Sequence, residues 1–300
     1  MFIKNKIILP VCIWMILVGS VNCKQEIFKN EKINFVYSSS TNDLWVGSSD
    51  GIYRVKDGKY TKAKNIKKGQ GVKGIAEDTT KNIYFGAGSK IVYYNTENES
   101  EEKTIDPAGM GRQDSYVNCL AIDKNNNLWI GRYNDMLVKY NGKSYERFPV
   151  WDVNSIDVTS SGDTWIATKS GLYRVKNGVL EEFNKDNSPL PDNDIKHILI
   201  DIYDNLWIST SNGLIKYNQH VWIIYNNENS PLKNNQVTTV YLDKEGSLIV
   251  GMQSGDLQIM KNGKWQELDL ALKNQAINNI FKDSNDLLLL GTDSGLIISK

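Results

Sequence analysis

Short apolar runs separated by polar turns recur along most of the chain, at intervals close to forty residues. The stretch "DNLWISTSNGLIKY" (204–217) shows the unit: a polar turn, the apolar run LWIS, a second turn that ends at Gly213, and the apolar run LIKY. Runs this short, bounded by such turns, predict β-strands rather than helices. Residues 24–300 show no amphipathic helical pattern. The pattern therefore predicts an all-β fold built from one repeated unit.

Seven copies of the unit align on the position of Trp207. The aligned residues are Trp45, Tyr84, Trp129, Trp165, Trp207, Ile249 and Leu289, with spacings of 39, 45, 36, 42, 42 and 40 residues. Twelve residues before this position, every copy has a β-branched residue: Ile33, Val72, Val117, Val153, Ile195, Val237 and Ile277. Six residues after it, glycine fills five of the seven copies. Chance would not hold such offsets through seven copies, so the repeat is real.

Turn signals divide each unit into four strands. A strand such as 195–200 precedes the tryptophan strand, and an aromatic, charged strand such as "HVWIIY" ends the unit. Asp-Gly or Asn-Gly pairs, which favour tight hairpins, stand before the fourth strand at 57–58, 141–142, 177–178 and 262–263. Four short antiparallel strands in forty residues are typical of a propeller blade. We therefore expect residues 24–300 to form a single seven-bladed β-propeller of four-stranded antiparallel blades.

The two ends of the chain predict how the ring closes. The seventh unit stops after its third strand, at "GLIISK". The segment "KQEIFKN" (24–30) is similar to a fourth strand placed before the first unit. We therefore expect an N-terminal strand to complete the last blade, which would protect the free strand edges there.

The first 22 residues have the features of a signal peptide. Lys4 and Lys6 precede twelve apolar residues from Ile7 to Val18, too few for a transmembrane helix, which needs about 20 residues. The segment ends in "GSVNC", which resembles a bacterial lipoprotein signal that would leave a lipidated Cys23 as the mature N-terminus. We expect an outer-membrane lipoprotein of a Gram-negative cell envelope. The alternative is cleavage near Ser20 and a soluble periplasmic or secreted protein.

The repeated units resemble the two-component regulator propeller repeat. The resemblance rests on the core "DNLWISTSNGLIKY" and on "NSPLPDNDI" (187–195) and "NSPLKNNQV" (229–237), which match the family's approach to the next blade. The family implies a propeller, and its members commonly form periplasmic sensor regions of membrane kinases that read carbohydrates or other ligands. This sequence has no membrane helix or kinase after the last blade, so a binding propeller is expected without a signalling output.

The composition of the chain limits the classes of partner that it is expected to bind. The chain has no formal net charge, and removal of residues 1–22 leaves 33 basic against 35 acidic side chains, which argues against nucleic acid. Cys119 lies in an apolar strand pattern and is expected to be a small buried residue, and no Cys/His cluster suggests a metal. Acidic turns such as "DKNNN" are expected to cap hairpins rather than bind calcium. We expect a monomer without a cofactor, attached to the membrane only through lipid.

A first set of candidate binding residues stands eleven positions before the aligned tryptophan. All seven are polar and lie between aliphatic residues on the predicted innermost strands. They are Asn34, Lys73, Asn118, Asn154, Lys196, Thr238 and Asn278, hereafter the polar ring. The ring predicts donors and acceptors at the mouth of the channel. The alternative is that these residues only line a water-filled channel.

A second set comes from the loops in which the copies differ. The longest predicted inter-blade loop is 103–116, and Arg112, Arg132, Tyr133 and Trp151 are expected to gather in the same sector. Guanidinium groups beside aromatic faces suit a planar, anionic or sugar-like ligand, or a protein hot spot. Loop residues without a partner are the alternative.

Catalytic machinery is sparse in the sequence. His197 and His220 are the two histidines, and His197 lies on a predicted first strand near the channel. No carboxylate stands at a recognisable offset from it, and the His/Glu set of the streptogramin lyases, which are also seven-bladed, has no counterpart here. We therefore favour a non-enzymatic binding module for a sugar-like or anionic ligand or an envelope protein. A lyase or hydrolase that uses His197 and carboxylates of the loop face is the alternative.

Overall fold

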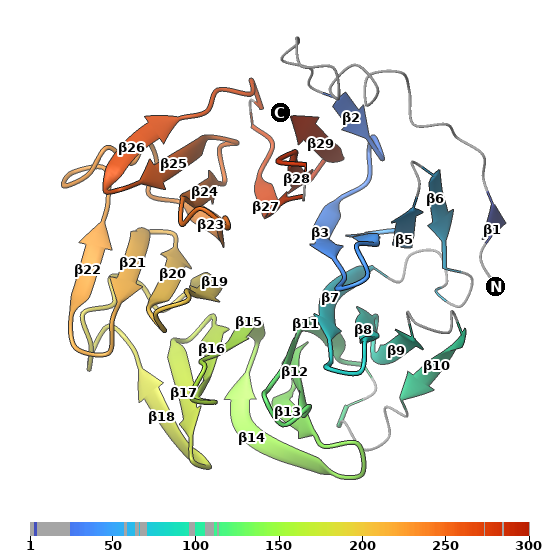
Figure 1. Cartoon of the computed structure of the whole chain (residues 1–300). Helices are drawn as coiled ribbons and strands as arrows, with labels where there is room; N and C mark the ends of the chain where they lie inside the picture. The colour runs from blue at the N-terminus through green and yellow to red at the C-terminus, as the bar shows by residue number, and fades with distance from the viewer. Residues whose placement is uncertain are drawn as a thin grey trace.

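The computed structural model describes residues 3–4, 25–56, 59–63, 66, 71–95, 100–105, 111–112, 114–272, 274–283 and 285–299. Cys23 and most of the predicted signal peptide lie outside these residues, as does the Asp57–Gly58 turn. The described residues form seven antiparallel sheets arranged as blades around a central channel (Figure 1). The predicted all-β, seven-bladed propeller is confirmed.

Each blade runs from an inner strand at the channel to an outer strand at the rim (Figure 1). Blade 1 contains β3 (Ile33–Ser38), β4 (Leu44–Ser48), β5 (Gly51–Lys56) and β6 (Lys59–Lys62). Blade 2 contains β7 (Val72–Glu77), β8 (Asn82–Ala87), β9 (Lys90–Asn95) and β10 (Ser100–Ile105). Blade 3 contains β11 (Tyr116–Ile122), β12 (Leu128–Tyr133), β13 (Met136–Tyr140) and β14 (Tyr145–Trp151).

The next three blades follow the same order. Blade 4 contains β15 (Val153–Val158), β16 (Thr164–Thr168), β17 (Leu172–Lys176) and β18 (Val179–Phe183). Blade 5 contains β19 (Ile195–Ile200), β20 (Leu206–Thr210), β21 (Gly213–Tyr217) and β22 (Trp222–Tyr225). Blade 6 contains β23 (Val237–Leu242), β24 (Leu248–Met252), β25 (Leu257–Lys261) and β26 (Lys264–Glu267).

Blade 7 joins strands from both ends of the described chain. It contains β27 (Ile277–Lys282), β28 (Leu288–Thr292) and β29 (Leu296–Ser299), and β2 (Gln25–Ile27) pairs antiparallel with β29. A two-residue strand, β1 (Ile3–Lys4), pairs with β6 on the outside of blade 1. No helix of the described part is long and apolar enough to cross a bilayer.

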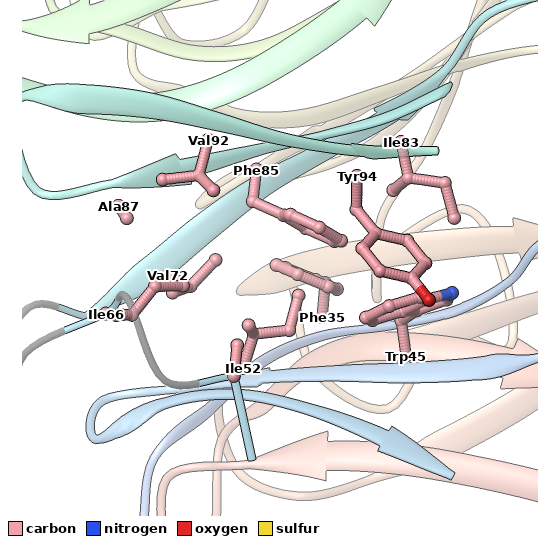
Figure 2. Close-up of a cluster of buried hydrophobic side chains, with 11 residues drawn as sticks. Phe35, Trp45, Ile52, Ile66, Val72, Ile83, Phe85, Ala87, Val92 and Tyr94 are labelled. Carbon is pink, nitrogen blue, oxygen red and sulfur yellow. The ribbon is translucent and has the colours of Figure 1, made fainter. Parts of the chain in front are cut away.

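The hydrophobic core lies between neighbouring blades rather than at the channel. Figure 2 shows the cluster between blades 1 and 2, where Trp45 packs against Phe85 and Tyr94 with ring centroids 5.1 and 5.5 Å apart. Trp129, Trp165 and Trp207 are likewise buried in clusters that join their blade to the next. The tryptophans are therefore structural anchors, because each supplies large apolar area to an inter-blade contact.

The repeated turns have the conformations that their residues favour. Gly213 adopts a φ of +123°, and a Cβ added there would lie 2.4 Å from the carbonyl oxygen of Tyr225. Only glycine fits such a position without strain. Asn177 and Gly178 both have positive φ, as the tight hairpin requires.

The acidic turns cap hairpins, as the sequence predicts. The carboxylate of Asp123 accepts hydrogen bonds from the main-chain N–H groups of Asn125 and Asn127, both at 2.9 Å. It also accepts a bond from Trp129 Nε1 at 3.1 Å, and Asp201 does the same for Trp207 at 3.3 Å. This aspartate therefore fixes both the turn and the tryptophan that anchors the blade.

Candidate functional site

A β-bulge near the start of each inner strand shapes the channel. In blade 5, Ile195 pairs with Thr210 while His197 pairs with Ser209, which leaves Lys196 as the extra residue. The same register shift occurs in all seven inner strands, in each case at the residue of the polar ring. A bulge re-aims the side chain of the extra residue. The bulge is the physical reason that the side chains of the polar ring turn toward the channel. The sequence pattern does not reveal this bulge.

The polar ring lines a central cavity of about 590 Å³. All seven members contribute: Asn34, Lys73, Asn118, Asn154, Lys196, Thr238 and Asn278. The described wall also includes residues outside the predicted set, among them Lys32, Lys169, Asp194 and His197. A cavity of this size matches the range of small-molecule sites.

Five members of the polar ring tie neighbouring blades together. Each donates a hydrogen bond to the carbonyl oxygen of the first residue of the next inner strand. The bonds are Asn34 Nδ2 to Val72 O (2.9 Å), Asn118 Nδ2 to Val153 O (3.1 Å), Asn154 Nδ2 to Ile195 O (2.8 Å), Thr238 Oγ1 to Ile277 O (2.6 Å) and Asn278 Nδ2 to Ile33 O (3.2 Å). We call these bonds the inter-blade clasps. They give the five residues a structural role, whatever they contact in the cavity.

The two lysines of the ring break this pattern. Lys196 Nζ bonds to Asp194 Oδ2 at 2.6 Å, and Lys73 Nζ donates to Asn118 Oδ1 at 3.1 Å. Lysine has a longer side chain than asparagine and carries a positive charge, so the ring is positively charged at these two positions.

Positive charge dominates the cavity wall. Among the described residues that line it, four are lysines and one, Asp194, carries a carboxylate. Lys196 is held by Asp194, and Lys32 by Asp293 at 2.7 Å. Among the described residues no carboxylate lies within salt-bridge distance of Lys73 or Lys169. Lys169 lies over the ring of Tyr133, with its Nζ 5.0 Å from the ring centroid.

The titration of Lys73 reflects this crowding. Desolvation by the cavity wall lowers its pKa, and the neighbouring charges of Lys32 and Lys169 lower it further. Clustered ammonium groups raise each other's free energy, which an anion between them would relieve. The cavity is therefore electrostatically suited to an anionic ligand.

Arg132 does not take part in such a site, contrary to the sequence prediction. Its side chain is fully buried, and its Nη2 donates to the carbonyl oxygens of Arg112 (2.6 Å) and Ser115 (3.2 Å). Its Nη1 lies 3.2 Å from Asp135 Oδ2. A buried guanidinium needs such partners, so Arg132 anchors the segment before β11 instead of facing a ligand.

The other members of the predicted sector lie at the surface. Arg112 is exposed and paired with Asp114 at 3.3 Å, and Tyr133 and Trp151 are 44% and 47% exposed. Tyr133 lines the cavity and pairs across strands with Tyr116, a 57% exposed aromatic that the sequence did not single out. The predicted loop 103–116 is shorter than expected, because Lys103–Ile105 belong to β10 and Tyr116 to β11.

His197 lies in the cavity wall with an uncharged imidazole. Burial lowers its pKa to about 4. No hydrogen bond joins it to a carboxylate among the described residues, and Asp194, an acidic residue of the cavity wall, is bound by Lys196. A general base needs an orienting partner, which the described wall does not give His197.

Cys119 also lines the cavity, and burial raises the pKa of its thiol, as expected for a small packed residue. Within the described ranges no three His, Cys, Asp or Glu side chains are placed to hold a metal ion.

Comparisons with known proteins agree with the fold. The model of the two component regulator propeller family matches residues 111–131 and 189–212. The extracellular domains of the hybrid two component systems BT3049 and BT4673 from B. thetaiotaomicron superpose with TM-scores of 0.76 and 0.74, at 20% and 22% identity. Each covers 93% of this chain, which spans only 41% and 40% of theirs.

A further solved structure aligns with this chain over almost its own full length. A catalytically inactive virginiamycin B lyase from Staphylococcus aureus, solved with quinupristin, superposes with a TM-score of 0.77 at 15% identity, over 93% of this chain and 99% of the lyase chain. Identities this low establish a shared fold alone. No curated protein sequence matches the chain. The chain is a seven-bladed β-propeller, and two of its segments match the model of the two component regulator propeller family.

Proposed function

We propose that this propeller is a non-enzymatic binding module that holds an anionic, sugar-like small molecule in its central cavity. The observation that carries the proposal is the excess of lysines over carboxylates in the cavity wall, with Lys73 and Lys169 lacking an acidic partner among the described residues. Both ammonium groups are exposed, so an anion can reach them, and it would relieve the repulsion between the neighbouring lysines. Tyr133, under Lys169 at the rim, offers an aromatic face to the ligand.

The site of action is the second part of the proposal. The sequence features of residues 1–22 support export, and "GSVNC" supports a lipid on Cys23 that holds the propeller at the cell envelope. The relatives of the same fold include extracellular domains of two component systems, which is consistent with a ligand met outside the cytoplasm.

The lipid anchor has a direct test. We expect intact-mass analysis of the mature protein to find an acylated Cys23, and Cys23→Ala to abolish incorporation of a labelled fatty acid. A mature chain that begins near Ser20, or that carries an unmodified Cys23, would contradict the anchor without bearing on the cavity.

Ligand binding can be tested with simple anions. We expect citrate and glucuronate to bind the wild-type protein in isothermal titration calorimetry at low ionic strength, and salt to weaken binding. The Lys73→Met/Lys169→Met double variant should lose at least about tenfold in affinity, or about 1.4 kcal/mol. Lys264→Met, on the outer strand β26, is the control and should bind as the wild type does. Equal affinity of the wild type and the double variant would refute the proposal, as would no binding of either anion.

A further inference from the structure

Blade 5 departs from the other blades at two paired positions next to the polar ring. The residue after the ring position pairs with a residue of the tryptophan strand. In the other six blades these pairs are Phe35–Gly47, Gly74–Gly86, Cys119–Gly131, Ser155–Ala167, Thr239–Gly251 and Asn279–Gly291, and in blade 5 the pair is His197–Ser209. Blade 5 therefore places an imidazole beside a hydroxyl where the other blades have glycine or alanine on the second strand.

In the other six blades the residue on the tryptophan strand is small because its partner on the inner strand needs the space. A Cβ added to Gly47 would lie 2.2 Å from the ring of Phe35, and one added to Gly131 would lie 2.3 Å from the sulfur of Cys119. Glycine at this position leaves room for its partner. The side chain of Ser209 fills part of this space and adds a polar atom. Packing alone therefore does not explain a serine at this position.

The polar atoms of this pair have no partner within the described structure. His197 Nδ1 and Ser209 Oγ are buried without a hydrogen bond, and so is Asp194 Oδ1, three residues before His197. A buried polar atom left unpaired costs about 1–3 kcal/mol. Native proteins keep such atoms where water or a ligand satisfies them. Three such atoms belong to one blade, and two of their residues, Asp194 and His197, line the cavity, so this part of the wall is the place to look for a polar group of the ligand.

The charges of this place differ from those across the channel. Asp194 accepts Lys196 Nζ on its Oδ2, so its charge is compensated while Oδ1 still needs a donor. β19, which carries His197, lies across the channel from β7, which carries Lys73 (Figure 1). The cavity therefore has a cationic side on blade 2 and a neutral, hydrogen-bonding side on blade 5.

We infer that Asp194 and His197, with Ser209 paired to His197 on the neighbouring strand, form a subsite, the blade-5 subsite, that binds a hydroxyl-bearing part of the ligand through the Asp194 carboxylate and the His197 imidazole. The inference rests on the proposed anion site and specifies its ligand as an anion that also carries neutral hydrogen-bond donors. The low pKa of His197 supports it, because the imidazole stays uncharged at neutral pH and does not compete with the lysines for the anionic end.

Two carboxylates of the same chain length separate the subsite from the anion site. Gluconate and hexanoate share the carboxylate, but only gluconate carries hydroxyl groups. We expect the wild type to bind gluconate at least about tenfold more tightly than hexanoate. The His197→Phe/Ser209→Gly double variant should remove this preference and leave the Kd of hexanoate unchanged. Lys73→Met should weaken both ligands by a similar factor and keep the preference.

The double variant is chosen so that the blade still folds. It reproduces the Phe35–Gly47 pair of blade 1, which packs without a clash in the same structural position (Figure 2 shows Phe35). A wild type that binds both carboxylates equally, or a double variant that keeps the preference, would overturn the subsite while leaving the anion site intact. If neither carboxylate binds, both the anion site and the subsite are refuted.

Imidazole NMR signals give a second measurement. The chain has two histidines, and His220 is exposed in the turn between β21 and β22, so it serves as an internal reference. We expect gluconate to shift the His197 signals and leave those of His220 in place, and hexanoate to move neither. Gluconate that binds without moving the His197 signals would contradict the subsite.

Discussion

Two titratable residues on neighbouring inner strands, Asp157 on β15 and His197 on β19, respond to pH in opposite directions. Burial raises the pKa of Asp157 to about 6, although the N–H groups of Ile200 and Val158 act against this shift. Burial lowers the pKa of His197 to about 4. The folded state therefore binds a proton at Asp157 more tightly than the unfolded chain does, and one at His197 less tightly.

Single variants separate the two contributions to stability. As the pH falls from about 6.5 to 4, His197 should cost the wild type up to about 3 kcal/mol relative to His197→Asn, because the unfolded chain takes up the proton first. As the pH falls from about 6 to 4, Asp157 should add up to about 3 kcal/mol relative to Asp157→Asn, because the folded state takes up the proton first. Urea unfolding across this pH range measures both differences. If the stability difference between each variant and the wild type does not change with pH, the shifted pKa values of these two buried groups are contradicted.

Single residues were predicted from the sequence only where the repeat constrains them. The polar ring was found from a fixed offset, and all seven members line the cavity. Arg132 was misread because its burial depends on the carbonyls of Arg112 and Ser115, in a segment that no other blade shares. Lys169 and Asp194 were missed because they stand in turns outside the aligned offsets, and only the folded ring brings them into the same cavity wall as Lys73.

Strands and their turns were predictable because each has a local chemical cause. β-Branched residues, Asn-Gly pairs and the turn glycines favour these conformations independently of the rest of the chain. The bulges and the inter-blade clasps were not predictable, because a bulge adds one residue without changing the spacing of the repeat. A clasp also needs the carbonyl of a different blade, about forty residues away, which a pattern within one unit does not contain.

The clasps make a measurable prediction for the contact between blades. Asn154→Ala removes the bond to the carbonyl of Ile195 and should lower the free energy of unfolding by about 1 kcal/mol. Lys196→Ala, at the same ring position in blade 5, makes no clasp and should change stability by less than about 0.5 kcal/mol, since its partly exposed ion pair contributes little. Denaturant unfolding compares the two variants. Equal losses would indicate that the clasps do not hold the blades together.

The whole ring depends on how blade 7 meets blade 1. β2 pairs with β29 through Gln25–Ile298, Glu26–Ile297 and Ile27–Leu296. Phe28 then packs against Tyr53 and Tyr60 of blade 1, with ring centroids 4.6 and 5.2 Å apart. The seam between blades 7 and 1 also has its own buried cluster, which includes Ile33, Val46 and Leu289. The segment before β3 therefore contacts both sides of the seam.

Deletion of residues 24–30 tests whether this segment closes the ring. The deletion removes the β2 ladder and the apolar side chains of Ile27 and Phe28, so we expect a sharp fall in melting temperature and a loss of at least about 4 kcal/mol of stability. The exposed edge of β29 should then promote self-association, visible by size-exclusion chromatography. Lys29→Ala, a change to an exposed side chain in the same segment, is the control and should behave as the wild type does. An unchanged melting temperature after the deletion would mean that the cluster between β28, β29 and blade 1 closes the ring without β2.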